Sequence, residues 1–197
     1  MSPSIAIPHD PAEFFERFFP EQFSRDHHRY PRDDSPGWAL FEVIGVGSWG
    51  IRRVSDTLAV TRGKPDDTLL QISLSGDDFK AIFVERTQRE VDSTGDLSDD
   101  SRDVFKPLFV NPQAADVIAI AVATLAFHLN HEGTARKLFF TPGPFERTEP
   151  RATINMHLHD FLAMLSGRKG FAKLLLLGKL RLRGDLLYAR RMSSLLR

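Results

Sequence analysis

The chain has 197 residues, enough for one domain or two small ones, and its 42% of hydrophobic residues can fill a core. Its 26 Lys and Arg residues balance 26 Asp and Glu residues, so no overall field attracts nucleic acid and we expect no nucleic-acid partner. The absence of cysteine excludes disulfide frameworks and cysteine nucleophiles. The N-terminus lacks a signal-peptide pattern and the longest apolar stretch, 117–129, is too short to cross a bilayer, so we expect a cytoplasmic protein.

A helix is predicted near the N-terminus. Asp10 suits the N-cap, Pro11 the first helical position and Glu13 the capping-box position. Four Phe residues follow on one face, and Pro20 is expected to end or kink the helix. The polar, proline-containing segment 24–37 is predicted to be a loop.

Residues 38–73 predict four short strands, which carry the sequences WALFEVIGV, IRRVS, TLAVTRG and TLLQISLS. Their linkers are too short for helical crossovers, so an antiparallel meander is expected. A helix from Ser75 to about Arg89 follows, because Ser75 and Asp78 form a capping-box pattern. The Asp-rich segment 91–103 predicts an exposed connector.

The apolar stretch 117–129 predicts the middle of a buried helix that begins at Pro112 and ends near His131, before Gly133. Beyond it the pattern alternates between strands and helices. We expect strands at 135–141, 151–157 and 179–183, and helices at 159–166, 171–177 and after Asp185. The inner stripe of the last helix is predicted to be Leu186, Ala189, Met192 and Leu196.

An internal repeat is indicated by an offset of 82 residues. At this offset Ile72, Asp78 and Phe79 fall on Ile154, Asp160 and Phe161, and an offset of 80 matches Thr61 and Gly63 to Thr141 and Gly143. Each copy is predicted to form a strand, a glycine-containing turn, a second strand and an acid-capped helix. The alternative is convergence, since any strand-to-helix junction favours an acid in the first turn.

The segment Gly45-Val46-Gly47-Ser48-Trp49-Gly50 matches the GxGxxG pattern of dinucleotide-binding loops. That site needs its third glycine to open a helix, whereas residues 51–60 have the pattern of a strand. We therefore interpret the glycines as a hairpin turn and expect no cofactor.

The histidines give no catalytic set. His27 and His28 lie in the predicted polar loop, and His128 and His131 fall one turn apart on the predicted helix, where two ligands alone do not make a zinc site. His157 is predicted to be a weak helix cap. We expect no metal site and no catalytic residues.

The C-terminal segment 168–197 holds nine Lys and Arg residues and one acid, Asp185. The chain is neutral overall, but its charge is therefore unevenly distributed along the sequence. One interpretation is a solvated face balanced by the acidic connector. The other is transient attraction to an anionic membrane surface.

The same C-terminal region carries a family resemblance. Its elements are Asp160-Phe161, Leu165-Ser166-Gly167, the run from Gly178 to Asp185 and the closing amphipathic helix. This order resembles the type-two sterol carrier protein family of lipid-binding domains, and residues 38–83 look like that family's opening meander. Residues 91–150 and the second strand–helix junction are departures from the family pattern.

The resemblance implies an α+β fold with a mostly antiparallel or mixed sheet, helices on one face and an apolar tunnel that binds a sterol, fatty-acyl chain or other lipid without covalent chemistry. The side chains expected to line it are Phe161, Leu165, Phe171, Leu175, Leu182, Leu186 and Met192. One alternative is a scaffold with a closed cavity that partners an enzyme of lipid-like substrates. A second is an enzyme with a histidine-based pocket.

The predicted organisation has four parts, and we expect them to pack together as one globular unit. They are the N-terminal helix and loop (1–37), a first strand–helix half (38–90), an acidic connector (91–111), and a buried helix with a second, sterol-carrier-like half (112–197).

Overall fold

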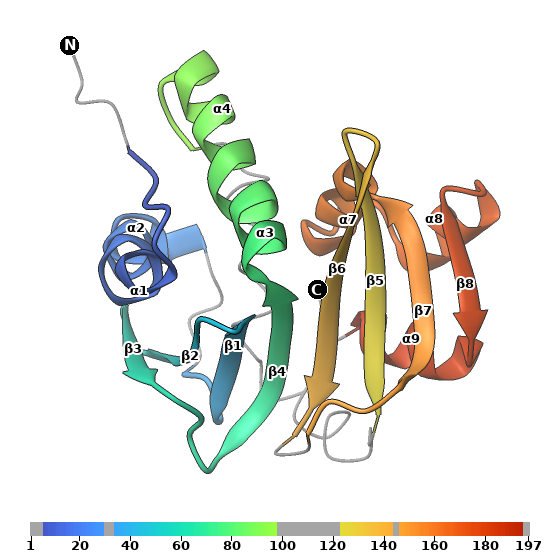
Figure 1. The fold of residues 1–197 in the computed structure, drawn as a ribbon, viewed down its shortest axis with the longest axis horizontal. Coiled ribbons are helices and arrows are strands. Elements are labelled where there is room, and N and C mark those ends of the chain that lie inside the picture. The colour runs from blue at the N-terminus through green and yellow to red at the C-terminus, as the bar shows by residue number, and fades with distance from the viewer. Residues whose placement is uncertain (1–5, 30–33, 98–122, 144–145, 195–197) are drawn as a thin grey trace.

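A computed structural model describes residues 6–29, 34–97, 123–143 and 146–194. The predicted α+β class is confirmed, because these residues form one eight-stranded mixed sheet with helices packed against it (Figure 1). The strands are β1 (Trp38–Ile44), β2 (Gly47–Val54), β3 (Thr57–Arg62), β4 (Thr68–Ser75), β5 (Thr124–His131), β6 (Thr134–Pro142), β7 (Pro150–His157) and β8 (Leu180–Gly184).

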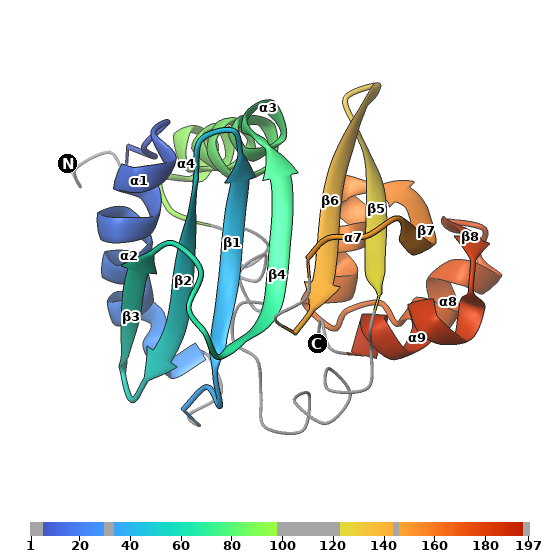
Figure 2. The same cartoon turned by 60° about the horizontal axis from the view of Figure 1, so that its bottom comes forward.

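The helices precede, separate and follow these strands. They are α1 (Pro11–Glu13), η1 (Phe14–Phe18), α2 (Phe19–Asp26), η2 (His27–Arg29), α3 (Gly76–Phe79), η3 (Lys80–Glu85), α4 (Arg86–Thr94), α7 (Leu158–Leu165), α8 (Phe171–Leu176) and α9 (Leu186–Ser194). Figure 2 shows α4 and α7 behind the strands, on one side of the sheet.

The strand order is β3-β2-β1-β4-β6-β5-β7-β8, so the sheet divides into a first half (β1–β4) and a second half (β5–β8). The halves join where β4 pairs with β6 in antiparallel fashion, from Leu70 opposite Pro142 to Ser73 opposite Phe139. Figure 1 shows this joint in the middle of the sheet.

Each half uses the same pairing pattern. In the first half β1 pairs with β2 antiparallel and with β4 parallel. In the second half β5 pairs with β6 antiparallel and with β7 parallel. The parallel register shifts after the first residue of the leading strand in both cases, at Trp38 and at Thr124. The offset of 80 matches Thr61 on β3 to Thr141 on β6, whereas the shared pairing pattern makes β6 the counterpart of β2.

The four strands predicted over 38–73 are present, but the antiparallel meander is wrong for the fourth. β4 lies beside β1 and runs parallel to it, so residues 63–67 must pass across β2 and β1 to reach it from β3. Gly50 leaves room for this passage, since a Cβ there would lie 2.5 Å from the Pro65 ring. The third glycine of GxGxxG therefore serves a close backbone approach, and the first, Gly45, lies in the predicted hairpin turn with φ +79°.

The helix predicted from Pro112 to about His131 is also wrong within the described residues, because Thr124–His131 is strand β5. β5 lies between β6 and β7 and is buried on both faces over most of its length. Its first four residues are buried whichever face they point to, so the alternation of a half-exposed strand is missing there and the sequence resembles that of a buried helix. Gly133 lies in the β5–β6 turn with φ +78°. Residues 112–122 of that prediction lie outside the described residues.

The N-terminal helix starts as predicted, with the Asp10 side chain accepting the Ala12 N–H at 3.0 Å. Pro20 does not end it. The π-helical turn η1 precedes the proline, the Phe19 N–H bonds to the Phe14 carbonyl, and the helix continues to Asp26. The wider turn removes the need for the N–H that proline lacks, so the segment predicted as loop begins with helix.

The core lies between the helices and one face of the sheet. In the first half Phe41 packs against Phe15, Phe79 and Phe83, with ring centroids 4.5–6.4 Å apart. The predicted cap holds here, because Ser75 Oγ accepts the Asp78 N–H at 3.1 Å.

Candidate functional site

The predicted tunnel wall lies mainly in the core of the second half. Phe161, Leu165, Phe171 and Met192 are each at most 4% exposed, and Leu175 and Leu182 are partly buried. These residues come from α7, α8, β8 and α9, as the sequence predicted. Their role as ligand contacts stays a prediction.

Leu186 differs from the rest of this set because 47% of its surface is exposed. Ala189 and Met192 of the predicted inner stripe are buried, together with Tyr188 and Ser193, so the stripe is wrong only for Leu186 among the described residues. Leu196 lies outside the described residues.

The position of α9 is fixed by contacts at its first turn. The Asp185 carboxylate accepts the Tyr188 N–H at 2.9 Å and lies 2.7 Å from Arg151 Nη2. The Tyr188 hydroxyl donates to the Ala123 carbonyl, and burial raises the pKa of Tyr188 to about 12. The pKa of Asp185 is lowered, mainly by the Tyr188 N–H and also by Arg151. These contacts hold α9 against the N-terminal end of β5 and β7.

Exposed leucines lie at both ends of β8. They are Leu176 (87% exposed) and Leu177 (57%) after α8, and Leu186 (47%) and Leu187 (68%) at the start of α9. Exposed apolar side chains in a group mark contact with an apolar partner more often than single ones do.

The histidine pairs do not form the pocket considered from the sequence. His128 and His131 are three residues apart on β5, so they point to opposite faces of the sheet. Burial lowers the pKa of His131, which lies beside Arg89 and Glu132. His27 bonds to the Ser24 carbonyl in the N-terminal segment. Within the described residues no three His, Asp or Glu side chains group as a metal site.

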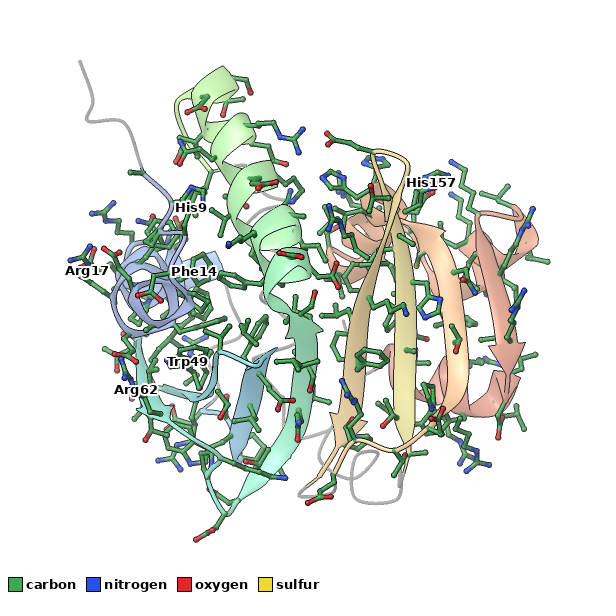
Figure 3. The ribbon with its side chains drawn as sticks, in the orientation of Figure 1. His9, Phe14, Arg17, Trp49, Arg62 and His157 are labelled. Carbon is green, nitrogen blue, oxygen red and sulfur yellow. The ribbon has the colours of Figure 1, made fainter. Side chains whose placement is uncertain are left out.

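His128 instead lies near His157, which Figure 3 shows at the end of β7, on the face of the sheet opposite the core. Both line a hollow of about 690 Å³, here called the polar hollow. Its lining residues are His128, Asn130, Ala135, Asn155, Met156, His157, Asp160, Gly178, Lys179 and Arg181. The sequence does not reveal this group, because the apolar pattern around His128 predicts a helix whereas His128 lies on strand β5.

The one acid that lines the polar hollow is already paired. Asp160 is 5% exposed and accepts from Lys169 Nζ at 2.8 Å, while Lys179 Nζ lies 3.9 Å away. Burial alone would raise the pKa of Asp160, but the hydrogen bond and charge of Lys169, with the charge of Lys179, lower it below its usual value. The carboxylate therefore stays ionised and neutralises mainly Lys169.

None of the helices in the described part of the chain combines the length and apolar character that a membrane crossing requires.

The fold and these surfaces define the chain as an α+β protein with an open mixed sheet. Residues 106–197 match the model of the SCP-2 sterol transfer family, which confirms the resemblance predicted from the C-terminal motifs. The match includes β5 to β8 and α7 to α9, and it does not include the first half. No curated protein matches the chain.

Solved structures of sterol carrier proteins are also similar to part of the chain. Sterol carrier protein 2 from Yarrowia lipolytica in its apo form is 19% identical over 43% of this chain and 74% of its own, with a TM-score of 0.37. Sterol carrier protein 2 like 2 from Aedes aegypti is 20% identical over 41% and 86%, with a TM-score of 0.31. Domain 2 of the Helicoverpa armigera sterol carrier protein is 18% identical over 48% and 86%, with a TM-score of 0.36.

Proposed function

We propose that this protein binds or transfers a hydrophobic molecule, such as a sterol, a fatty-acyl chain or another lipid, without catalysing a reaction. The observation that carries the proposal is the family match over residues 106–197, which contain every element of the second half. The ligand would lie between α7, α8 and α9 and the core face of β5, β7 and β8.

The side chains in this region suit such a ligand. Phe161 packs against Phe127 at a ring distance of 5.0 Å, and the predicted wall continues through Leu165 and Met192. Each CH₂ group moved from water into an apolar site contributes about 0.8 kcal/mol, so a long chain needs no polar contact there. The partly buried Leu175 and Leu182 lie at the margin of this region, where a guest would enter.

The test is a titration of lipid-free protein with a fluorescent fatty acid and a fluorescent sterol. Leu182→Trp enlarges a partly buried side chain on edge strand β8, and Leu58→Trp is its matched control on the other edge strand, β3. We expect L182W to weaken binding about tenfold by filling the site, a loss of about 1.4 kcal/mol, and L58W to leave it unchanged. Equal losses in both variants, or no saturable binding, would contradict the proposal.

The scaffold alternative is favoured by the packing of the same region, since Phe161 and Leu165 are only 1% exposed within one continuous core. Native mass spectrometry of gently purified protein separates the two functions. A co-purifying lipid supports the carrier, whereas a ligand-free protein that takes up neither probe supports the scaffold.

A transient contact with an anionic membrane, at a cytoplasmic location, extends the proposal. The exposed Leu176, Leu177 and Leu187 accompany the exposed cations Lys173 and Arg190 in the C-terminal region. Each cation near an anionic surface contributes about 1 kcal/mol, and salt screens this attraction. The fraction of protein that sediments with anionic vesicles should therefore fall as salt is raised from about 20 to 200 mM, because the Debye length shortens over this range.

An internal duplication of a strand–helix unit is the last part of the proposal. It is supported by the shared pairing pattern of the two halves. The offset of 82 residues also relates Ser75, at the N-cap of α3, to His157, at the N-cap of α7. The ligand-binding role would then belong to the second copy.

A further inference from the structure

The polar hollow lies on the sheet face that the helices leave uncovered. Alternation along the strands separates the two faces: Leu180 and Leu182 point to the core, while Arg181 points to the hollow. On β7 the same alternation separates buried Ile154 from Asn155. The hollow and the predicted lipid wall are therefore on opposite sides of one sheet.

Strand register brings four polar side chains into one row across this face. Arg181 is opposite Asn155, Asn155 is opposite His128, and His128 is opposite Lys137. Directly opposed residues have Cβ atoms about 5 Å apart, so the row is continuous. In the adjacent row, His157 is opposite Asn130.

The cations in this row have no acidic partner within residues 6–29, 34–97, 123–143 and 146–194, since neither Arg181 nor Lys137 forms an ion pair there. Asp160 is bonded to Lys169. Lys179 lies 3.9 Å from Asp160, beyond hydrogen-bond distance. The hollow is thus a concave surface with available positive charge.

The N-terminus of α7 adds to this charge. α7 begins directly after His157, whose side chain makes no capping hydrogen bond, whereas Ser75 caps the corresponding helix of the first half. Uncapped amides at a helix N-terminus attract anions. This feature reinforces the cationic row and does not define the site by itself.

We propose that the polar hollow binds a phosphate group carried by an organic molecule. The Arg181 guanidinium offers a fork of N–H donors that matches phosphate oxygens, and the Lys179 ammonium adds a second charge. The Asn155 and Asn130 amides add neutral donors and acceptors. A volume of about 690 Å³ exceeds what one phosphate fills and is within the range of small-molecule sites, so the ligand has an organic part.

This site is independent of the proposed lipid function, because it uses the other face of the sheet and none of the predicted wall residues. Its ligand could come from a soluble phosphate ester or from a phospholipid headgroup, and the phosphate chemistry is common to both. A soluble phosphate ester binds in the absence of a membrane, whereas a headgroup ligand binds only as part of a vesicle.

Calorimetric titrations with pyrophosphate and with glycerol phosphate, at low salt, test the site. Arg181→Gln removes the fork, and Arg183→Gln is the matched control, since Arg183 is exposed on the same face of β8 but outside the hollow. We expect R181Q to weaken binding about tenfold and R183Q less than about twofold. Thermal unfolding of both variants checks that the edge strand remains folded.

Flotation with vesicles of phosphatidylcholine containing phosphatidic acid is the second arm. Saturable binding of glycerol phosphate that depends on Arg181 supports a soluble ligand. Vesicle binding that depends on Arg181 and not on Arg183, without binding of free glycerol phosphate, supports a headgroup. Equal losses in R181Q and R183Q, or binding in neither arm, would overturn the site. The lipid titration of L182W remains interpretable in every case, because Leu182 faces the other side.

Discussion

The two halves of the sheet share a pairing pattern but differ on the face that lacks helices. In the first half, residues 63–67 cross this face and Pro65 lies over Gly50. In the second half the equivalent position is Phe139, since Leu40 pairs with Gly50 and Ala126 pairs with Phe139. An aromatic side chain therefore stands on this face of the second half where the first half has a glycine.

The difference originates in the connections. β2 leads to an edge strand, β3, and the chain must then return across the sheet to β4. β6 leads to β7 through residues 143–149, and Arg147 from this connection lies over the Phe139 ring at 4.8 Å. One strand–helix pattern thus produces a covered face in one half and the polar hollow in the other.

The largest expected effect is that of Gly50→Val. A Cβ at this position would lie 2.5 Å from Pro65 Cγ and 3.0 Å from Thr61 Cγ2, so the crossing segment would have to move. We expect a loss of about 3 kcal/mol in the free energy of unfolding, measured by urea denaturation.

Two further variants sharpen this test. Pro65→Ala in the G50V background removes the opposing ring and should restore part of the stability. Ser48→Val changes a neighbouring position of β2 on the same face and should shift stability by less than about 0.5 kcal/mol. If G50V and S48V lower the free energy of unfolding by the same amount, the close approach of Pro65 to Gly50 does not determine where β4 lies.

The second prediction compares the acids at the start of α7 and α3. Asp160→Asn removes the buried charge that holds the partly buried Lys169, and we expect a loss of about 2 kcal/mol at pH 7. The pKa of Asp160 is lowered in the folded protein, so its contribution is present above the usual carboxyl pKa of about 3.9 and disappears as pH falls through the folded value. The difference between wild type and D160N should therefore shrink toward pH 3, in urea titrations at several pH values.

Asp78→Asn is the matched control in the first half. Asp78 accepts the Lys137 N–H at 3.2 Å and lies 3.6 Å from Arg136, so its amide analogue keeps an acceptor and loses only a weak ion pair. We expect a smaller loss, about 1 kcal/mol. A larger loss in D78N than in D160N would reverse the comparison.

The sequence predicts most elements whose ends are marked by capping or turn residues. Asp10, Ser75 and Asp185 each cap the helix that was expected after them. Local hydrogen bonds of this kind join residues two or three positions apart, and so they can be predicted from a single sequence.

Predictions failed where distant residues decide the structure. β5 was predicted as helix because residues 124–127 are buried on both faces by residues distant in the sequence, which removes the alternation that marks a strand. The parallel placement of β4 brings Pro65 close to Gly50, a contact that the pattern of neither strand reveals. The polar hollow was missed for the same reason, since Arg181, Asn155 and His128 come together only through strand register. The alternation of Arg181 and Arg183 was the one local indication of that face.

The third prediction concerns how α9 is held against the second half. Tyr188→Phe removes the hydroxyl that donates to the Ala123 carbonyl, and we expect a loss of about 1 kcal/mol. Burial raises the pKa of Tyr188 to about 12, so wild type loses stability as pH rises from about 10, the usual value, toward 12. Y188F should lack this alkaline loss in thermal unfolding. An identical loss in both proteins would mean that another group is responsible.

The smallest effect tests the corresponding contact in the first half, where Glu16 joins the N-terminal helix to β2 and β3. Figure 3 shows Trp49 and Arg62 below this helix; Trp49 Nε1 donates to Glu16 Oε1 at 2.9 Å and Arg62 Nη2 to Oε2 at 3.1 Å. Hydrogen bonds from Arg62 and Trp49 lower the pKa of Glu16, so the contact persists below the usual carboxyl pKa of about 4.3. In a Trp38→Phe background Trp49 is the remaining one of two tryptophans, and its fluorescence should change with a midpoint below about 4.3. Glu16→Gln should remove this fluorescence transition, while circular dichroism shows that the fold is retained over the same pH range. If E16Q leaves the midpoint unchanged, the tryptophan reports acid unfolding and not the titration of Glu16. The N-terminal helix would then be held by its buried phenylalanines alone.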